Sequence, residues 1–459
     1  MTLTILSNAT VIPGNHTSRP ITDGAVVIKD DLIADLGPTQ DILPLYPAAD
    51  VYDCSDKAIF PGLINPHAHL TATLHRGITE DLGFPNAVRF PSPINSYLSD
   101  DDRRIMASLG ALECIRTGNT TVAEVAQDIQ SYGKSLATTG LRFVFGESIA
   151  DGIIPTDYRP GEPVSKFSEA LMDQGLQKAH DLFSTWHNHP GGRISCIGAA
   201  QLVETSSPNL LRNVRTLAAS YDVPYTIHLG QSLLEVQSLL QMWGVRPARY
   251  LFDQNFLSPY LVAAHCRYLD TSEIGLLGKT KSGVSHQPAM AARRGVFPPI
   301  VTLRASGCQI GLGTDNNTQD MVEVMRTALF TERLFRDDAI NPQPEDVLEE
   351  ATLGSARVLH LDKFVGSLEP GKKADLFVLN KMKPHLVPST RIVSGFIHNG
   401  QPGDIEAVMV NGVFIMKDDK VLTMDEDSLI HEADRIGRRV WTTLLKEYPH
   451  LPFPFQLNG

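Results

Sequence analysis

Between residues 59 and 365, short apolar runs typical of β-strands alternate with longer segments whose apolar residues recur at helical spacing. Such alternation is typical of βα units, in which helices join parallel strands and cover them. The runs expected to be strands are Ile59–Ile64, Thr120–Glu124, Leu141–Phe145, Arg193–Ile197, Pro224–Leu229, Leu261–His265, Gly283–Ser285 and Gln309–Gly313. Eight units of this kind close a (β/α)8 barrel, so the sequence predicts an α/β fold built on a TIM barrel.

The two ends of the chain share a different pattern, in which brief β-like runs are broken by turns. Residues 1–58 and 366–425 both show it, and we expect them to combine into one small β-sandwich domain. The barrel would then occupy residues 59–365. Residues 426–459 are expected to form a C-terminal helix and an extended tail.

Composition excludes several classes of partner. The net charge is −12 with no run of lysine or arginine, which argues against nucleic acid and anionic membranes. No apolar stretch approaches the roughly 18 residues that a membrane span needs. The five cysteines form no CxxC pair, which favours reduced thiols in the cytoplasm over a disulfide framework or a thiolate zinc site. We expect a cytoplasmic homo-oligomer, a dimer or larger, that acts on a small molecule.

Two histidines, His67 and His69, lie one residue apart just after the first expected strand. Side chains at positions i and i+2 of a strand point the same way, so both imidazoles can meet one metal ion. A bare His-x-His is more often an unrelated pair on a polar strand end. The pair therefore needs further ligands before it indicates a metal site.

Three more polar residues follow other expected strands: His228, His265 and Asp315. A single histidine at a strand end is usually a hydrogen-bonded structural residue. An ordered set at the carboxyl ends of barrel strands instead suits a catalytic divalent cation with an open coordination position. Zinc is the ion we expect, and Co²⁺, Fe²⁺ or Mn²⁺ would also accept imidazole and carboxylate ligands.

With these residues in place, the chain resembles the amidohydrolase superfamily, and within it the branch of nucleobase and S-adenosylhomocysteine deaminases and triazine hydrolases. More narrowly, it is similar to phenylurea and thiocarbamate (molinate-type) herbicide hydrolases, which would imply xenobiotic degradation. The matching segments are Pro61-Gly62-Leu63-Ile64-Asn65-Pro66-His67-Ala68-His69, His228, Ala264-His265-Cys266, Gly313-Thr314-Asp315 and Gly366-Ser367-Leu368-Glu369-Pro370-Gly371-Lys372-Lys373-Ala374-Asp375-Leu376.

The resemblance implies one metal ion held by His67, His69, His228 and Asp315, with His265 as a catalytic neighbour. A bound divalent cation lowers the pKa of water to about 7. Asp315 would exchange protons with that water, and His265 would stabilise the developing oxyanion. Relatives with two metals carry a bridging lysine at the fourth strand, and residues 193–200 contain no lysine.

The chain departs from the deaminase pattern at Gln231. That branch has His-x-x-Glu after the fifth strand, where this sequence reads His228-Leu229-Gly230-Gln231. An amide cannot deliver a proton to a ring nitrogen, although it can donate and accept hydrogen bonds. Gln231 therefore favours cleavage of a C–N or C–S bond at the carbonyl of an amide, urea or (thio)carbamate. The alternative is an aminohydrolase, a deaminase or dechlorinase acting on a purine, pyrimidine or s-triazine ring, whose acid lies elsewhere, for example at Glu235.

Four further residues are candidates for substrate contact: His286, Asn316, Phe84 and Trp243. For the aromatic ones, core packing is the default interpretation. Two other readings of the whole chain stay open. Residues 146–150 nearly match the G-x-S-x-G of serine hydrolases, although the last position is alanine. A noncatalytic scaffold that has lost its metal is the other, and the retained ligand positions argue against it.

Overall fold

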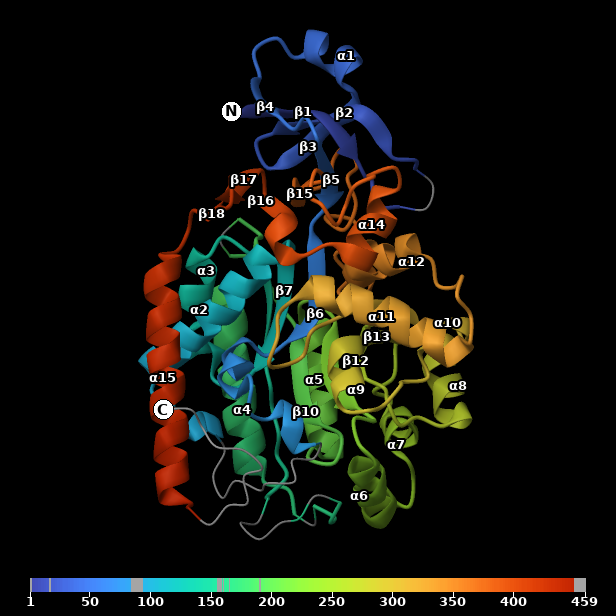
Figure 1. The fold of residues 1–459 in the computed structure, drawn as a ribbon. Helices are drawn as coiled ribbons and strands as arrows, with labels where there is room; N and C mark the ends of the chain where they lie inside the picture. The colour runs from blue at the N-terminus through green and yellow to red at the C-terminus, as the bar shows by residue number, and fades with distance from the viewer. Residues whose placement is uncertain are drawn as a thin grey trace.

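The computed structural model describes residues 2–15, 18–83, 94–154, 159, 161–164, 166–189 and 191–449. Within them, the predicted (β/α)8 barrel is confirmed (Figure 1). Its parallel strands, in chain order, are β6 (Leu63–Ala68), β7 (Asn119–Ala126), β8 (Arg142–Glu147), β9 (Ile194–Cys196), β10 (Gly198–Leu202), β11 (Tyr225–Leu229), β12 (Leu261–His265), β13 (Gly283–His286) and β14 (Gln309–Leu312).

Two short connections complete the ring of strands. Between β9 and β10, the N–H of Ile197 donates to the carbonyl of Phe145 at 2.9 Å, so these two short strands together fill the fourth position. Past the end of β14, the N–H of Asp315 donates to the carbonyl of His67 at 3.0 Å, and the N–H of His69 donates back to Asp315 at 3.0 Å. The residues that close the barrel are therefore the residues expected to hold the metal.

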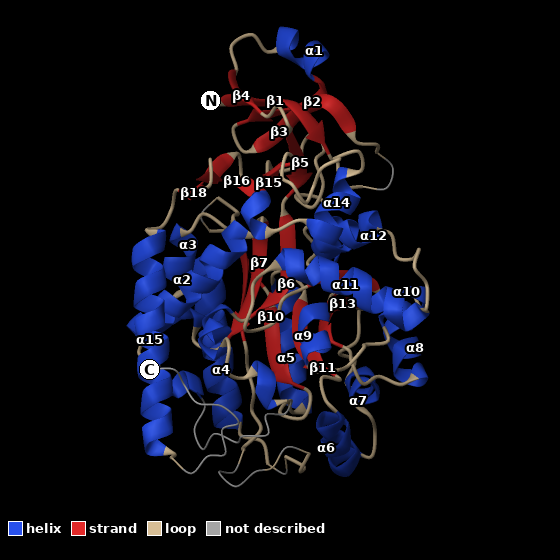
Figure 2. Cartoon of the chain, viewed as in Figure 1, coloured by secondary structure: helices blue, strands red, loops and turns tan. Residues whose placement is uncertain are grey.

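Most of the helices cover the barrel from outside, whereas the first one, over residues 39–42, lies beside the strands of the N-terminal region (Figure 2). Several begin at side-chain caps, as at Ser207, whose hydroxyl accepts from the N–H of Leu210. The helices are α1 (Thr39–Ile42), α2 (Asp100–Arg116), α3 (Gly133–Thr138), α4 (Glu169–Trp186), α5 (Pro208–Ser220), α6 (Leu233–Trp243), α7 (Pro247–Asp253), α8 (Thr271–Lys279), α9 (Pro288–Arg293), α10 (Ile300–Ala305), α11 (Met321–Arg336), α12 (Pro344–Glu349), α13 (Ser355–Val358), α14 (Ile392–Asn399) and α15 (Glu426–Glu447). A 3-10 segment, η2 (Leu70–His75), directly follows His69.

Both chain ends join in one sheet at the end of the barrel where β6 begins (Figure 1). Its order is β18-β17-β16-β15-β5-β1-β2-β3, with β4 beside β1. The strands are β1 (Leu3–Val11), β2 (Ile21–Lys29), β3 (Leu32–Pro38), β4 (Asp50–Asp53), β5 (Lys57–Pro61), β15 (Leu376–Asn380), β16 (Ile405–Val410), β17 (Val413–Lys417) and β18 (Lys420–Val421). A buried ion pair, Arg142 Nε to Asp375 Oδ2 at 2.9 Å, ties this sheet to the barrel.

The run expected as one strand, Ile59–Ile64, serves two sheets. It divides at Gly62, so that β5 pairs with β1 and β15 while β6 enters the barrel. A Cβ atom on Gly62 would lie 2.1 Å from Thr120 Oγ1, so only glycine fits where the chain passes from one sheet to the other. The barrel segment thus starts slightly later than residue 59.

The predicted C-terminal helix is α15, which lies along the outside of the barrel against α2 (Figure 1). Its apolar face, which includes Ile436, Val440 and Leu444, packs in a cluster with residues of η2 and α2. Residues 450–459, most of the expected extended tail, lie outside the described part of the chain. Among the described helices, none is both long and apolar enough to cross a membrane.

Candidate metal centre

The imidazoles of His69 and His228 face each other across the mouth of the barrel. The Nδ1 of His69 lies 2.6 Å from the carbonyl of Val125, and the Nδ1 of His228 lies 2.5 Å from the carbonyl of Gln201. A carbonyl only accepts, so each Nδ1 carries the proton and each Nε2 of the neutral ring presents a lone pair. The two Nε2 atoms are 3.2 Å apart. Two lone pairs at that distance repel, and a cation between them turns the repulsion into coordination.

His67 completes a group of three imidazoles. Its ring centroid lies 4.7 Å from that of His69 and 4.8 Å from that of His228. Both of its ring nitrogens are buried, and neither has a hydrogen-bond partner among the residues that the structure describes. A buried polar atom left unpaired costs roughly 1–3 kcal/mol, which a metal ligand bond would offset. The donor set therefore fits a divalent cation: His67, His69 and His228 form one group that could hold it, and His67, His265 and Asp315 form a second.

Asp315 directs its two carboxylate oxygens to different neighbours. Oδ1 is 3.6 Å from His69 Nε2, and Oδ2 is 3.8 Å from His265 Nδ1. Both Asp315 and His265 have left-handed backbones, with φ of 72° and 77°. Such conformations are uncommon outside glycine and persist where surrounding contacts impose them. Here they occur at the last residue of β12 and three residues past the end of β14, where both side chains join the group with His67.

Burial favours the neutral form of three histidines, His67, His228 and His265. It lowers the pKa of His228 to about 4, with the neighbouring His69 adding to the effect. It also lowers the pKa values of His67 and His265 well below 6.5, and the positive charge of Arg267 contributes to the shift at His265. Neutral imidazole is the form that binds metal, so no proton has to be displaced from these rings near neutral pH.

The sequence did not indicate the role of two amide side chains, Asn65 and Gln287, that support the cluster. Asn65 is fully buried, donating from Nδ2 to Thr314 Oγ1 at 2.7 Å while its Oδ1 accepts from the backbone N–H of Thr314 at 3.2 Å. Gln287 accepts from the N–H of His265 at 3.0 Å. Both hold the strand ends that carry the cluster. Each stands beside a proline in its motif, but nothing in the sequence indicates which backbone groups they bind.

A cavity of about 490 Å³ opens beside the cluster. Its described lining includes His69, His228, Gln201, Ser148 and Asn316. Asn316, expected to contact substrate, therefore lies where a ligand could reach it. Its Oδ1 is buried and makes no hydrogen bond to the described residues.

The aminohydrolase alternative raised from the sequence would use Glu235 as its acid, but in the structure this carboxylate binds the backbone of the Gln231 segment. Glu235 accepts from the backbone N–H groups of Gly230 and Gln231 at 2.8 and 2.7 Å. Burial, followed by repulsion from Glu204, raises its pKa well above 4.5. Both carboxylate oxygens are thus engaged in shaping the turn, and Glu235 is not among the described residues that line the cavity.

The other three residues expected to contact substrate, His286, Trp243 and Phe84, differ in where they lie. His286 is buried at the end of β13, and its Nδ1 has no hydrogen-bond partner among the described residues. Trp243 lies instead on the outer layer, where it stacks on Tyr250 at 5.3 Å and is 42% exposed. Trp243 is not among the described residues that line the cavity. Phe84 lies outside the described residues.

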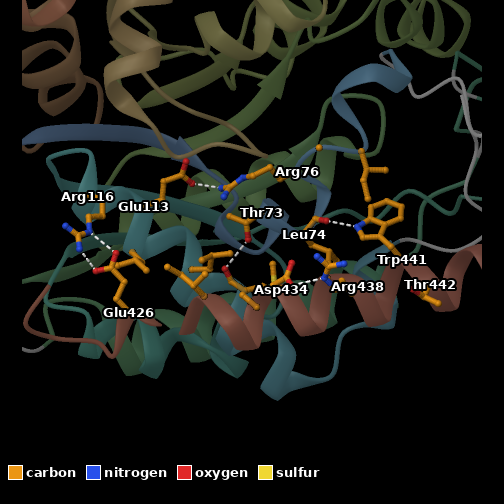
Figure 3. A pocket seen from close by; sticks show the side chains of 18 residues that line it. Thr73, Leu74, Arg76, Glu113, Arg116, Glu426, Asp434, Arg438, Trp441 and Thr442 are labelled. Carbon is orange, nitrogen blue, oxygen red and sulfur yellow. Dashed lines mark hydrogen bonds and ion pairs between the residues drawn. The ribbon is translucent and has the colours of Figure 1, made fainter. Parts of the chain in front are cut away.

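A larger hollow, about 890 Å³, lies outside the barrel between α2, α15 and η2 (Figure 3). Charged residues at its edges are already paired, as in Arg116 with Glu426 and Arg76 with Glu113. None of the histidines of the cluster lines it. It is therefore separate from the site of chemistry.

Comparison with known proteins fits this geometry. Residues 58–415 match the model of the Amidohydrolase family. The chain belongs to the amidohydrolase family. A 5-methylthioadenosine/S-adenosylhomocysteine deaminase of Desulforudis audaxviator is 30% identical, over 95% of this chain and 98% of its own. A zinc-bound adenosine deaminase structure from Xanthomonas campestris is 25% identical, with a TM-score of 0.85 over 96% of this chain and 98% of its own.

The same fold occurs in the atrazine chlorohydrolase of Arthrobacter aurescens, at 22% identity and a TM-score of 0.81, covering 95% of this chain and 100% of that one. This amidohydrolase is accordingly a metal-dependent hydrolase that acts on carbon–nitrogen bonds. The curated relative acts on a nucleoside rather than on a phenylurea or thiocarbamate. The comparisons thus favour the aminohydrolase alternative over the expected cleavage of ureas and carbamates.

Proposed function

We propose that this amidohydrolase is an aminohydrolase that replaces the exocyclic amino group of an adenine-type ring by oxygen. The observation that carries the proposal is the similarity to a 5-methylthioadenosine/S-adenosylhomocysteine deaminase, which extends over 95% of the chain. In this reaction a water oxygen bonds to the ring carbon, the carbon–nitrogen bond breaks, and ammonia leaves. The cavity beside His69 and His228 gives such a ring access to the cluster.

The described side chains divide the chemistry between them. A divalent cation held by the cluster would supply acidity to water, lowering its pKa to about 7. Asp315 Oδ2, which points toward His265, is placed to accept a proton and return it to the leaving group. His265 is neutral and can donate a hydrogen bond to negative charge developing on the substrate. Zinc is the ion we propose, because the similar adenosine deaminase structure contains it.

One observation favours a second function. Gln231 stands where deaminases of this branch carry glutamate, and an amide cannot protonate a ring nitrogen. Attack on a carbonyl needs no such proton. Hydrolysis of a urea or (thio)carbamate is therefore the second candidate, and it would use the same cluster with Asp315 protonating the leaving amine or thiol.

An activity panel with zinc-loaded protein separates the two. It contains adenosine, 5-methylthioadenosine, S-adenosylhomocysteine, an s-triazine, a phenylurea and a thiocarbamate. We expect ammonia release from one or more of the adenine compounds and no aniline or thiol from the others. Cleavage of the phenylurea or thiocarbamate with no ammonia from any adenine compound would reverse the assignment.

A further inference from the structure

Arg267 is a buried cation that the chemistry above does not use. It follows His265 by two residues, at the carboxyl end of β12, and only 4% of its surface is exposed. None of its three guanidinium nitrogens makes a hydrogen bond to the residues that the structure describes. A guanidinium carries five N–H donors and cannot escape the cost of burial by losing its proton.

The nearest carboxylate does not satisfy this group. Arg267 Nη2 lies 3.7 Å from Asp315 Oδ2, a distance that gives electrostatic attraction but is too long for a hydrogen bond. The same oxygen is 3.8 Å from His265 Nδ1. Arg267 and His265 thus approach one side of Asp315, while His69 approaches its other oxygen. The guanidinium borders the metal cluster without being a ligand of it.

A second arginine adds to the positive charge there. Burial lowers the pKa of Arg267 to about 10, and the nearby positive charge of Arg294 is the next cause. Asp315 is the first of the groups that oppose this lowering of the pKa at both arginines, ahead of Tyr268, and it is also a candidate metal ligand. A divalent cation that shared this carboxylate would leave less of its negative charge to offset the positive charge of Arg267. Such a site favours a ligand that brings its own negative charge or a strongly polarised oxygen.

We propose that Arg267 is a ligand-binding residue that donates, from its unpaired N–H groups, to a carboxylate or carbonyl oxygen of the molecule bound beside Asp315. Guanidinium matches such planar acceptors in a fork geometry. The proposal rests on the proposed function only in taking the histidine cluster as the ligand site. It adds the requirement that the bound molecule presents an oxygen acceptor next to the reacting centre. An adenine ring gains such an oxygen when oxygen replaces its amino group.

The test measures binding rather than turnover. The full chain is loaded with Co²⁺, whose visible absorption responds to ligands entering its coordination shell, and is titrated with acetate. We expect the dissociation constant of acetate to rise at least about tenfold in Arg267→Gln, the loss expected for a charge-assisted hydrogen bond. The dissociation constant of acetate for Arg267→Lys should lie between those of wild type and Arg267→Gln, because an ammonium group keeps the positive charge but loses the fork geometry of the guanidinium.

Two controls isolate the guanidinium. Imidazole, a neutral metal ligand without oxygen, should bind all variants equally. Arg293→Gln removes a cation that is already paired with Glu323 at 2.8 Å and should leave acetate binding unchanged. Equal acetate affinity in wild type and Arg267→Gln would overturn the proposal, as would an equal loss of imidazole binding. If Arg267→Gln does not fold, unchanged acetate affinity in Arg267→Lys has the same meaning. Inactivity toward adenine compounds, by contrast, bears on the proposed function alone.

Discussion

In His69 and His228, the hydrogen bond made by Nδ1 determines that Nε2 carries the lone pair. Because both Nδ1 atoms donate to backbone carbonyls, both Nε2 lone pairs point into the space between the rings. The sequence could predict that these side chains gather, since each follows a barrel strand. It could not predict the carbonyls of Val125 and Gln201, which depend on where neighbouring strands end.

Gln231 provides the sharpest single-residue test of the proposed reaction. If an adenine ring is the substrate, Gln231→Glu restores a proton donor, and general acid catalysis is typically worth about 10²–10⁴-fold. We expect ammonia release from adenine compounds to rise by at least about tenfold, measured as kcat/KM, whereas Gln231→Met should not raise it. A fall or no change in Gln231→Glu would favour the carbonyl candidate.

His286 makes stability depend on pH. Burial, with smaller effects from Arg304 and Arg267, lowers its pKa to about 3. In the unfolded chain the value is about 6.5, so above that pH the residue is neutral in both states. As the pH falls from 6.5 toward 3, only the unfolded chain takes up the proton, and the free energy of unfolding drops by up to about 1.4 kcal/mol per pH unit.

Urea unfolding of metal-free protein at pH 7.0 and pH 5.5 measures this contribution. Wild type should lose about 1 kcal/mol more than His286→Gln over that interval. Equal losses in the two proteins would mean that His286 is charged in the folded state or reaches solvent.

Among the elements, the helices and strands of the barrel were the most predictable. Helix α5 shows why, since Ser207 and Pro208 mark its start and apolar residues at helical spacing form its inner face. The change of sheet at Gly62 was not predicted, because Pro61-Gly62 interrupts the apolar run but does not indicate that the two halves pair in different sheets. The surroundings of Trp243 were not predictable either, because the sequence does not indicate that its ring stacks on Tyr250.

Helix α15 holds the segment that follows His69. Trp441 Nε1 donates to the carbonyl of Leu74 at 2.8 Å, and the indole is 4% exposed (Figure 3). We expect Trp441→Ala to lower the free energy of unfolding by about 3–5 kcal/mol, because it leaves a cavity between α15 and η2. Trp441→Phe keeps most of the side-chain volume but leaves the carbonyl of Leu74 unpaired, so it should lower the free energy of unfolding by about 1–3 kcal/mol.

Chemical denaturation of the two variants checks this order. If alanine cost no more than phenylalanine, the contribution of packing by α15 would be refuted. The metal content should stay at the wild-type level in Trp441→Phe, because the change lies outside the cluster.

At the scale of the whole molecule, residues that are candidate metal ligands also close the barrel. The candidate ligands come from the start of the barrel, from β11, and from the residue past β14 that hydrogen-bonds back to His67. A bound cation therefore links residues far apart in sequence, and its binding free energy adds to folding stability. Chelation should lower the melting temperature, and this dependence should vanish in His228→Ala.

We propose that His67, His69, His228 and Asp315 hold one catalytic divalent cation. The most direct test of this proposal is the metal content of purified, dialysed protein by mass spectrometry. We predict about one divalent ion per chain in wild type, and loss of most of it in His69→Ala and His228→Ala, whereas Arg293→Gln keeps it. Wild-type protein without bound metal, or His228→Ala with a full complement, would contradict the account.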